Sequence, residues 1–401
     1  MRRRRHRQRD HRRGAELRHF DVLIVGTGHA GATTAIHLRQ LGNTGSIGLL
    51  GEEEELPYER PPLSKDYLAG KKSAADILFR PCNFRAERDV TLIPGERVVS
   101  IDPGARTIGC ASGATISYGN LVWTAGGRPK RVAGAHVIRS LADVDTLRAE
   151  LPSATRILII GGGYIGLEAA AVLTSLGKQV TLAEAADRVL ARCAAEPLSR
   201  FLEAEHRAHG VDIHLNTSSI DHNQHDLVIA GIGILPNVDP LLQAGAEGAD
   251  GVLVDEHCRT TLPHVWAAGD CALHHNPFGP ARPIRIESVQ NASDMATTIA
   301  RALTGQPQPY RAVPWFWSNQ YDLRLQTVGL SNDHDEVLVR GDPATRKFAV
   351  IYRRAGRVIA LDCINNVRDY VQGRGLIESG VEVDAALLAD PDRPLKSLLE
   401  S

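Results

Sequence analysis

The chain has 401 residues, of which 43% are hydrophobic and 23% charged, and these values predict a soluble protein of several globular domains. No apolar run approaches the roughly 20 residues that cross a bilayer, which excludes a transmembrane protein. Six cysteines without a CxxC pair disfavour a disulfide-rich secreted scaffold, a zinc site and a dithiol redox centre. We therefore expect a cytoplasmic protein with no metal and no membrane partner.

The first 14 residues differ from the rest of the chain. They read MRRRRHRQRDHRRG and hold eight arginines against one aspartate, although the net charge of the whole chain is −1. No apolar residue follows Met1, which argues against a signal peptide or an amphipathic transit helix. We predict a disordered, arginine-rich arm over residues 1–18. A tether to nucleic acid or to an anionic surface is the alternative to a solvated tail, and we favour the tail and expect no nucleic-acid partner.

A strand–turn–helix–strand pattern follows the arm. Residues 20–25 form an apolar strand, a GxGxxG turn follows, and a helix over 32–41 leads to a strand over 46–50 that ends near Glu52. The turn contains Gly26, Gly28, Ala30 and Gly31. Its glycines let the backbone approach a pyrophosphate at the helix N-terminus, and the acid is placed to accept hydrogen bonds from a ribose. The pattern predicts a dinucleotide-binding fold.

The same pattern recurs 135 residues later. A strand over 156–160 precedes a second glycine turn, a helix over 167–176 and a strand over 179–183, which ends at Glu184. The turn contains Gly161, Gly163 and Gly166. A carboxylate at position 184 accepts both ribose hydroxyls of an adenosine and repels a 2′-phosphate, so we expect NADH rather than NADPH.

Two dinucleotide folds in one chain favour a flavin dinucleotide and a nicotinamide dinucleotide held ring against ring. Three further segments support this pairing. Residues 120–129 and 226–237, the second with Gly233, resemble the two crossovers between the nucleotide domains of flavoprotein reductases. A short strand after His264 ends at Asp270, which in such flavoproteins bonds the ribityl chain of FAD. A helix N-cap is the alternative role for Asp270, and the two roles are compatible.

With these motifs in place, the sequence resembles the FAD-containing, NADH-dependent ferredoxin reductases of bacterial Rieske oxygenase and cytochrome P450 systems. The most specific match is PYERPPLSKDYLAG at 57–70, joined by GGGYIGLE at 161–168, RIESVQN at 285–291 and VPWFWSNQ at 313–320. The resemblance covers about residues 19–395.

The resemblance implies an α/β fold of the glutathione-reductase type, with two Rossmann-like dinucleotide-binding domains and a C-terminal α+β domain. The FAD-binding domain would be discontinuous, over 19–125 and 240–310. The NAD-binding domain would span 126–239, and the C-terminal domain 311–401.

The resemblance also implies roles for individual residues. Ala30 and Gly31 would face the FAD pyrophosphate, and Glu52 the adenosine ribose. Val98 would contact the adenine end. Further FAD contacts would come from Arg60, Arg139, Asp270 and Val289, with the last two at the ribityl chain and the pyrimidine edge.

At the junction of the rings, Lys65 would lie beside the isoalloxazine and pair with Glu168, which would orient the nicotinamide carboxamide. Glu184 would bind the NAD ribose. Trp317, with Trp315 beside it in the sequence, would stack near the flavin and line the exit for electrons, and core packing is the alternative.

Physical arguments support the roles that the resemblance implies. Pro61 and Pro62 fix the backbone before Lys65, and a cation beside the flavin favours its reduced, anionic form. A helix beginning near Val289 would direct the positive end of its dipole at the pyrimidine edge. Hydride transfer between cofactors needs no nucleophile or general base, so we expect positioning to be the main task of the protein.

We expect a flavoprotein oxidoreductase that passes electrons from NADH through FAD to a [2Fe–2S] ferredoxin, which feeds an oxygenase of aromatic compounds. A rubredoxin reductase is the alternative enzyme, and an NADH-sensing flavoprotein that resembles the apoptosis-inducing factors is the non-enzymatic one. The protein would be a monomer or a homodimer.

Two features bear on partner docking and on stability. Six basic residues in the C-terminal domain suit an acidic ferredoxin through electrostatic steering, with a solvated sheet face as the alternative. They are Arg340, Arg346, Lys347, Arg353, Arg354 and Arg357. Only twelve residues separate Ile213 from Asp226, where relatives have a few tens, so we expect a shortened NAD domain with an exposed sheet edge.

Overall fold

A computed structural model of the chain describes residues 18–79, 89–217 and 221–399. The predicted arm lies outside the described residues except for Arg18, with which the first strand begins. None of the helices in the described ranges has the length and apolarity that a bilayer crossing requires.

The first sheet has the strand order β3-β2-β1-β6-β5-β4, and β15 also pairs with β6, at residues Leu121–Trp123. Its strands are β1 (Arg18–Val25), β2 (Ile47–Leu50), β3 (Val90–Ile93), β4 (Val98–Asp102), β5 (Thr107–Cys110), β6 (Thr115–Trp123) and β15 (Val265–Ala267). The pairs among β1, β2, β3, β6 and β15 are parallel, whereas β4 and β5 pair antiparallel. Helices α1 (His29–Gln40) and α7 (Val289–Leu303) pack against each other beside this sheet. Because β15 and α7 follow residue 260, this unit is assembled from two separate stretches of the chain.

The second sheet is fully parallel, in the order β10-β9-β8-β11. Its strands are β8 (Arg156–Ile160), β9 (Gln179–Ala183), β10 (Asp212–His214) and β11 (Leu227–Ala230), with helices α3 (Leu141–Glu150), α4 (Tyr164–Ser175) and α5 (Glu196–Ala208). Strand β10 pairs only with β9, over three residues, and forms one edge of the sheet. The predicted exposed edge is therefore present, and the short connection from β10 to β11 contains residues 218–220, which are outside the described ranges.

The third sheet is antiparallel, in the order β17-β18-β21-β20-β19. It comprises β17 (Trp315–Gln320), β18 (Leu323–Gly329), β19 (Glu336–Asp342), β20 (Lys347–Arg354) and β21 (Arg357–Ile364), followed by α8 (Val367–Ser379) and α9 (Ala385–Ala389). Shorter elements are β7 (Gly127–Pro129), β12 (Ile234–Pro236), α6 (Asp239–Gln243), β13 (Gly248–Ala249), β14 (Gly251–Leu253), β16 (Ala272–Leu273) and the 3-10 turns η1 (Pro61–Ser64), η2 (Ala75–Ile77), η3 (His222–Gln224), η4 (Pro343–Thr345) and η5 (Leu395–Leu399).

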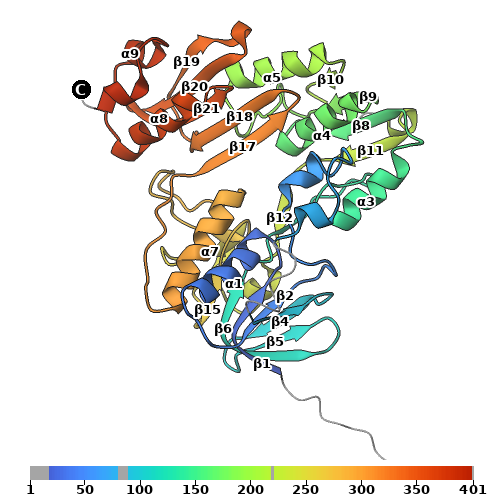
Figure 1. Cartoon of the computed structure of the whole chain (residues 1–401), viewed down its shortest axis with the longest axis vertical. Helices are drawn as coiled ribbons and strands as arrows, with labels where there is room; N and C mark the ends of the chain where they lie inside the picture. Colours follow the sequence, from blue (N-terminus) through green and yellow to red (C-terminus); the bar gives the residue numbers. More distant parts are fainter. Residues whose placement is uncertain (1–17, 80–88, 218–220, 400–401) are drawn as a thin grey trace, which may run out of the picture.

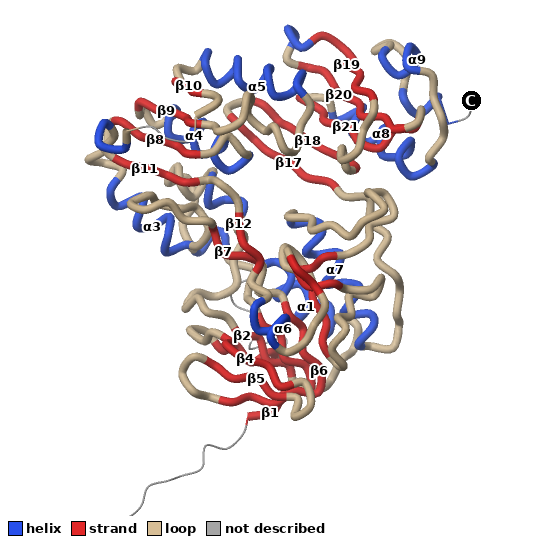
Figure 2. Tube along the Cα trace, turned by 180° about the vertical axis from the view of Figure 1, so that it is seen from behind, coloured by secondary structure: helices blue, strands red, loops and turns tan. Residues whose placement is uncertain are grey.

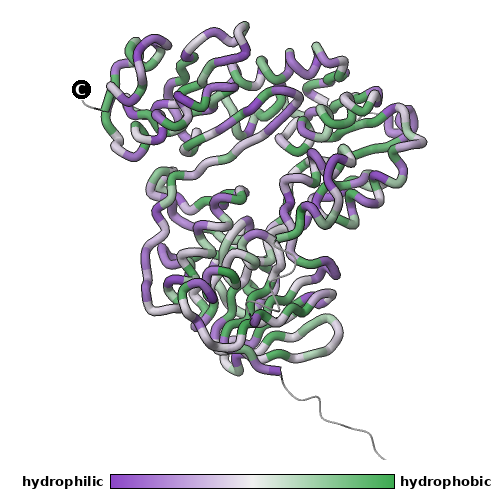
Figure 3. Tube along the Cα trace, viewed as in Figure 1, coloured by the Kyte–Doolittle hydropathy of each residue, from purple (hydrophilic) through white to green (hydrophobic). Residues whose placement is uncertain are grey.

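The second and third sheets lie side by side, and the first sheet forms a separate lobe beneath them (Figure 1). From behind, the antiparallel pair β7–β12 lies at the crossing between the first and second units (Figure 2). Hydrophobic residues follow the strands of each lobe, while hydrophilic residues gather on loops and outer turns (Figure 3). One hydrophobic core fills the first unit, and a second core joins residues of the second sheet to Leu323, Phe348 and Tyr352 of the third.

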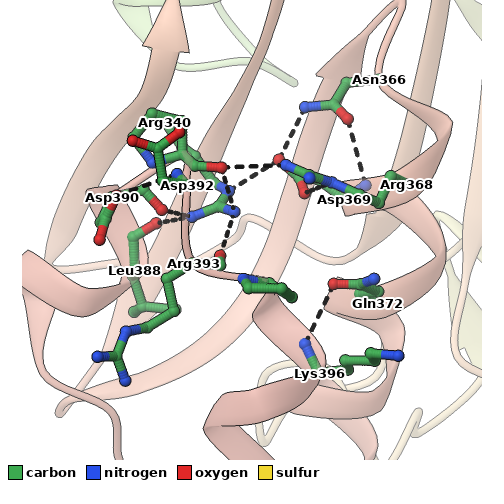
Figure 4. A network of polar contacts seen from close by, with 12 residues as sticks. Arg340, Asn366, Arg368, Asp369, Gln372, Leu388, Asp390, Asp392, Arg393 and Lys396 are labelled. Carbon is green, nitrogen blue, oxygen red and sulfur yellow. Dashed lines mark hydrogen bonds and ion pairs between the residues drawn. The ribbon is translucent and has the colours of Figure 1, made fainter.

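The C-terminal unit is closed by a buried ionic cluster around Arg340 of β19 (Figure 4). The guanidinium is fully buried, and its Nε donates to Oδ2 of Asp369 over 2.7 Å. Its other nitrogens donate to the carbonyl oxygens of Leu388, Asp390 and Arg393. The cluster therefore ties the tail after α9 to both β19 and α8.

Candidate functional site

A cavity of about 1140 Å³ opens between the three units. That volume exceeds the usual range for a small ligand and suits a dinucleotide. Twelve of the residues predicted for the site line it: Gly26, Gly28, Ala30, Glu52, Arg60, Lys65, Val98, Arg139, Glu168, Asp270, Val289 and Trp317. Six others do not line it: Gly31, Gly161, Gly163, Gly166, Glu184 and Gly233.

In the first turn, two glycines have no room for a side chain, and the third, Gly28, has room for one. A Cβ on Gly26 would lie 2.3 Å from the carbonyl oxygen of Thr124, and one on Gly31 would lie 1.8 Å from that of Gly26. At Gly28 the nearest atom is 3.8 Å away, so protein packing does not require glycine there. Helix α1 begins after Gly28 without a side-chain cap or an acid in its first turn, which leaves its N–H groups free for an anion.

The second turn repeats this arrangement. A Cβ on Gly161 would lie 2.5 Å from the Gly231 carbonyl oxygen, and one on Gly166 would lie 2.0 Å from that of Gly161. Gly163 again leaves open space, with its nearest neighbour at 3.9 Å. Helix α4 also begins without a side-chain cap or a first-turn acid. Both turns therefore retain glycine where a pyrophosphate would pass, and the residues present fit two dinucleotides.

Glu184 ends β9 beside the second turn. Its Oε2 accepts the Gly162 N–H over 2.7 Å, and its Oε1 accepts the Ala186 N–H over 2.8 Å. The carboxylate therefore lies at the glycine turn, as a ribose acceptor requires. Gly233 lies in the loop before β12 with a left-handed φ of 96°.

Glu168 and Lys65 meet at the centre of the cavity. The Lys65 Nζ lies 2.6 Å from Glu168 Oε2, and Ser64 Oγ donates to the same oxygen over 2.5 Å. Ser318 Oγ donates to Glu168 Oε1 over 2.6 Å. The carboxylate is 3% exposed. Lys65 directly follows η1, which packs against α4, and Glu168 lies in α4 beside the second sheet. Ser318 comes from β17 of the third sheet, and Gly28 and Val289 of the first unit line the same cavity, so this ion pair lies where all three units meet.

A second ionic group lines the part of the cavity nearer the first turn. Arg60 Nη2 pairs with Glu53 Oε1 at 2.5 Å, and Arg139 Nη2 pairs with Asp270 Oδ2 at 3.3 Å. Burial, followed by the nearby cations of Arg60 and Arg139, lowers the pKa of His29 to about 4, so this side chain is neutral at pH 7. Glu52 is more exposed, and its side chain lies 4.0 Å from Arg97.

Helix α7 begins at the cavity. Ser288 is its N-cap and accepts the N–H of Asn291, and no acid lies in the first turn. Val289 is the first helical residue and lines the cavity, as does Ser288. The positive end of the α7 dipole therefore lies at the cavity wall, where it would favour negative charge on a bound ring.

Aromatic side chains form the wall at β17. Trp317 and Phe316 line the cavity together with Tyr164 of α4, and the rings of Phe316 and Tyr164 lie 4.7 Å apart. Trp315 is absent from the lining, and it packs against the core of the C-terminal unit with its ring 5.6 Å from that of Trp317. Core packing is therefore the better description of Trp315.

The positive charge expected in the C-terminal unit is partly neutralised at four of its six basic residues. Each of the four forms an ion pair inside the chain, because acidic side chains of neighbouring elements face it. The pairs are Arg340 with Asp369, Arg346 with Glu205 and Asp322, Arg353 with Glu336, and Arg357 with Glu382.

The sequence reasoning missed several residues of the site. Ser64 and Ser318, which hold Glu168, lie inside motifs already recognised at 57–70 and 313–320. The motifs indicated that these segments belong to the site, but the position of a serine in a turn or strand does not indicate which distant residue it contacts. Glu53, the partner of Arg60, was passed over for the neighbouring Glu52.

Comparison with known proteins identifies the family of this chain. Residues 20–296 match the family described as pyridine nucleotide-disulphide oxidoreductase, and residues 315–399 match the reductase C-terminal family. The 5,5′-dehydrodivanillate O-demethylase ferredoxin reductase subunit of a Sphingobium species is 55% identical, with 95% of this chain and 98% of the relative aligned. A ferredoxin–NAD(P)+ reductase of a Sphingomonas species is 51% identical, with 95% and 98% aligned. The solved covalent complex of putidaredoxin reductase with putidaredoxin matches with a TM-score of 0.89 at 37% identity, over 94% of this chain and 98% of that one.

The chain belongs to the pyridine nucleotide-disulphide oxidoreductase family. It is an oxidoreductase that uses FAD and NAD(P)H, and the predicted fold of two dinucleotide-binding units with a C-terminal α+β unit is confirmed. The five cysteines that the structure describes are free thiols, and four of them are buried.

Proposed function

We propose that the chain is the NADH:ferredoxin oxidoreductase of an oxygenase system. The observation that carries the proposal is the Lys65–Glu168 pair, which lies where the two dinucleotide units and the C-terminal unit meet. When bound, FAD accepts a hydride from NADH and releases electrons singly to an iron–sulfur partner. The task of the protein is to hold the two rings together and to exclude water.

We assign FAD to the unit built from residues 19–125 and 240–310, and the nicotinamide dinucleotide to 126–239. The turn at Gly28 and the N-terminus of α1 would hold the FAD pyrophosphate. Asp270 and the N-terminus of α7 would hold the ribityl chain and the pyrimidine edge. The turn at Gly163 would hold the second pyrophosphate, and Glu168 the carboxamide.

NADH is the preferred donor. Glu184 accepts the Gly162 N–H of the turn after β8 and the Ala186 N–H after β9, and a 2′-phosphate beside this carboxylate would be repelled. The nearby Arg188 pairs with Asp187 at 3.1 Å and donates to the Ala191 carbonyl, so both of its terminal nitrogens are already engaged.

The electron acceptor is a [2Fe–2S] ferredoxin that feeds a terminal oxygenase, with an aromatic compound as the final substrate. The support is the names of the relatives, an O-demethylase reductase subunit among them, and the similarity to a reductase solved in complex with its ferredoxin. Trp317 of β17 lines the cavity from the C-terminal unit, and we place it at the electron exit. The free thiols suit the cytoplasm.

The test is anaerobic reduction of the FAD-loaded protein by NADH, followed by mixing with oxidised [2Fe–2S] ferredoxin. We expect flavin bleaching by NADH and rapid return of the oxidised flavin spectrum on mixing. Rubredoxin in place of ferredoxin tests the alternative enzyme. Bleaching without reoxidation by either protein would contradict the reductase assignment and favour an NADH-sensing flavoprotein.

A further inference from the structure

A chain of hydrogen bonds leads from Glu168 at the cavity to the molecular surface. Ser318 Oγ lies 2.6 Å from Glu168 Oε1, and Gln320 Nε2 lies 3.1 Å from Ser318 Oγ. His206 Nε2 then lies 2.8 Å from Gln320 Oε1, and the Tyr321 hydroxyl 3.0 Å from His206 Nδ1. Ser318, Gln320 and His206 are at most 2% exposed, whereas Tyr321 is partly exposed.

The carboxylate fixes the direction of every bond in this chain. Paired with Lys65, Glu168 can only accept, so Ser318 must donate its single O–H to it. Ser318 then accepts from the amide nitrogen of Gln320, which turns the amide oxygen toward His206. His206 must donate from Nε2 and therefore accepts at Nδ1, where the Tyr321 hydroxyl donates. The tautomer and the amide orientation thus follow from the network, and all four bonds point toward Glu168.

Burial keeps the two ring members of the chain in the protonation states that this direction requires. It is the main cause that lowers the pKa of His206 to about 4, so the imidazole is neutral at pH 7 with one N–H. Burial also raises the pKa of Tyr321 to about 12, so its hydroxyl remains a donor.

The outer end of the chain is held in a strained turn. Tyr321 is the first residue of the two-residue turn between β17 and β18, and its φ is 55°, a left-handed value that is uncommon outside glycine. Its ring stacks on His209 with centroids 3.7 Å apart. Arg346 pairs both with Asp322 of the same turn and with Glu205 of α5, which fixes the hairpin to the helix that carries His206. Strain at such a place is commonly associated with function.

We propose that Ser318, Gln320, His206 and Tyr321 are positioning residues that hold the Glu168 carboxylate in its working orientation. The proposal rests on the proposed function, in which Glu168 orients the nicotinamide. The Tyr321 hydroxyl locks the His206 tautomer. Without it, the imidazole can carry its proton on Nδ1, the Gln320 amide can flip, and its oxygen then draws the Ser318 hydroxyl away from Glu168.

Two variants test the ends of the chain in the FAD-loaded enzyme. Ser318→Ala removes the bond to Glu168, and Ser318→Thr keeps a hydroxyl as the rescue variant. Tyr321→Phe removes only the distant hydroxyl. Tyr118→Phe is the matched control, because the buried Tyr118 hydroxyl has no hydrogen-bond partner within the described part of the chain.

The measurements are the rate of flavin reduction at saturating NADH, the Kd of NAD+ from the flavin absorbance of the oxidised enzyme, and the Tm. We expect about tenfold slower reduction for Ser318→Ala and about threefold for Tyr321→Phe, equivalent to about 1.4 and 0.6 kcal/mol in the barrier. NAD+ should bind more weakly to both, with FAD content unchanged. Ser318→Thr and Tyr118→Phe should stay within twofold of the parent protein.

Nitrogen-15 NMR of histidine-labelled protein gives a readout that does not depend on turnover, with His206→Asn to identify the signal. We expect His206 as the neutral Nε2–H tautomer from pH 5.5 to 8 in the parent protein, and a share of the Nδ1–H tautomer in Tyr321→Phe. An imidazolium or an Nδ1–H tautomer in the parent overturns the proposal, as does Tyr321→Phe or Ser318→Ala with unchanged reduction rate and NAD+ affinity. A parent protein that NADH does not reduce would instead refute the proposed function and leave the tautomer result standing.

Discussion

Replacing Lys65 by methionine should separate the structural from the chemical importance of the ion pair at the cavity. Glu168 is 3% exposed, and the side chain of Lys65 is 19% exposed. Removing one partner of a buried pair costs about 3–5 kcal/mol, because the remaining charge stays desolvated. Water reaches the lysine here, and Ser64 and Ser318 still donate to the carboxylate, so we expect a loss near the lower bound, about 3 kcal/mol, in the free energy of unfolding.

The same substitution should slow flavin reduction by NADH tenfold or more, which corresponds to about 1.4 kcal/mol in the barrier. FAD should stay bound, because the glycine turn and Asp270 are unchanged. In the double variant Lys65→Met/Glu168→Gln no uncompensated charge remains, so stability should recover in part while the reduction rate should not. This opposite response of stability and rate is the signature of a pair that acts on the nicotinamide as well as on folding.

Lys72→Met is the matched control. Lys72 lies seven residues further along the chain and pairs with Asp66 at 3.9 Å, with both side chains exposed. An exposed pair contributes at most about 1 kcal/mol, so neither stability nor rate should change appreciably. Stopped-flow reduction at saturating NADH and urea unfolding measure the two quantities. A Lys65→Met enzyme with full FAD occupancy and a rate within twofold of the parent would refute the reasoning.

Three further predictions concern stability and specificity. Burial raises the pKa of Asp362 to about 7, so the folded state retains a proton that the unfolded state releases near pH 4, and the free energy of unfolding falls as pH rises toward 7. Asp362→Asn keeps an acceptor for the Tyr352 hydroxyl, and its advantage over the parent in urea unfolding should grow by about 3 kcal/mol between pH 5 and pH 8. A difference in stability that stays constant over this range would show that the carboxyl titrates normally. Glu184→Gln should reduce the preference for NADH over NADPH in kcat/KM about tenfold, and comparable values for both donors in the parent enzyme would refute the ribose assignment. Arg340→Met should lower the free energy of unfolding by about 3–5 kcal/mol, because Asp369 loses its main partner. Flavin reduction by NADH should persist, because neither residue lines the cavity. A variant as stable as the parent would show that the cluster does not hold the tail.

The fold could be predicted because its signals are local. Strand, glycine turn and helix repeat twice within short segments, and the structure has β8 and β9 over the predicted residues 156–160 and 179–183. In each turn, a Cβ on the first glycine would collide with the backbone of the crossover segment, and a Cβ on the last glycine would collide with the backbone of the first. The start of α7 at Val289 was likewise predictable, because a serine N-cap precedes a helical pattern.

Contacts between segments far apart in the chain could be predicted only where the family resemblance supplied them, as for Lys65 and Glu168. The bonds from Ser64 and Ser318 to Glu168 span 104 and 150 positions, and no periodicity encodes them. The ion pairs of the basic residues in the C-terminal unit are also contacts of this kind. Counting arginines gives a charge, but only packing shows that Arg346 is already paired with Glu205 of another unit.

The short connection in the second unit lies away from the cavity. The short connection joins β10 to β11, whereas the glycine turn follows β8 and Glu184 follows β9. None of the described residues between β10 and β11 lines the cavity. Strand β10 pairs with β9 over three residues, whereas Glu168 is held by groups from η1 and β17. The β10 edge and the Glu168 carboxylate are therefore held by different contacts.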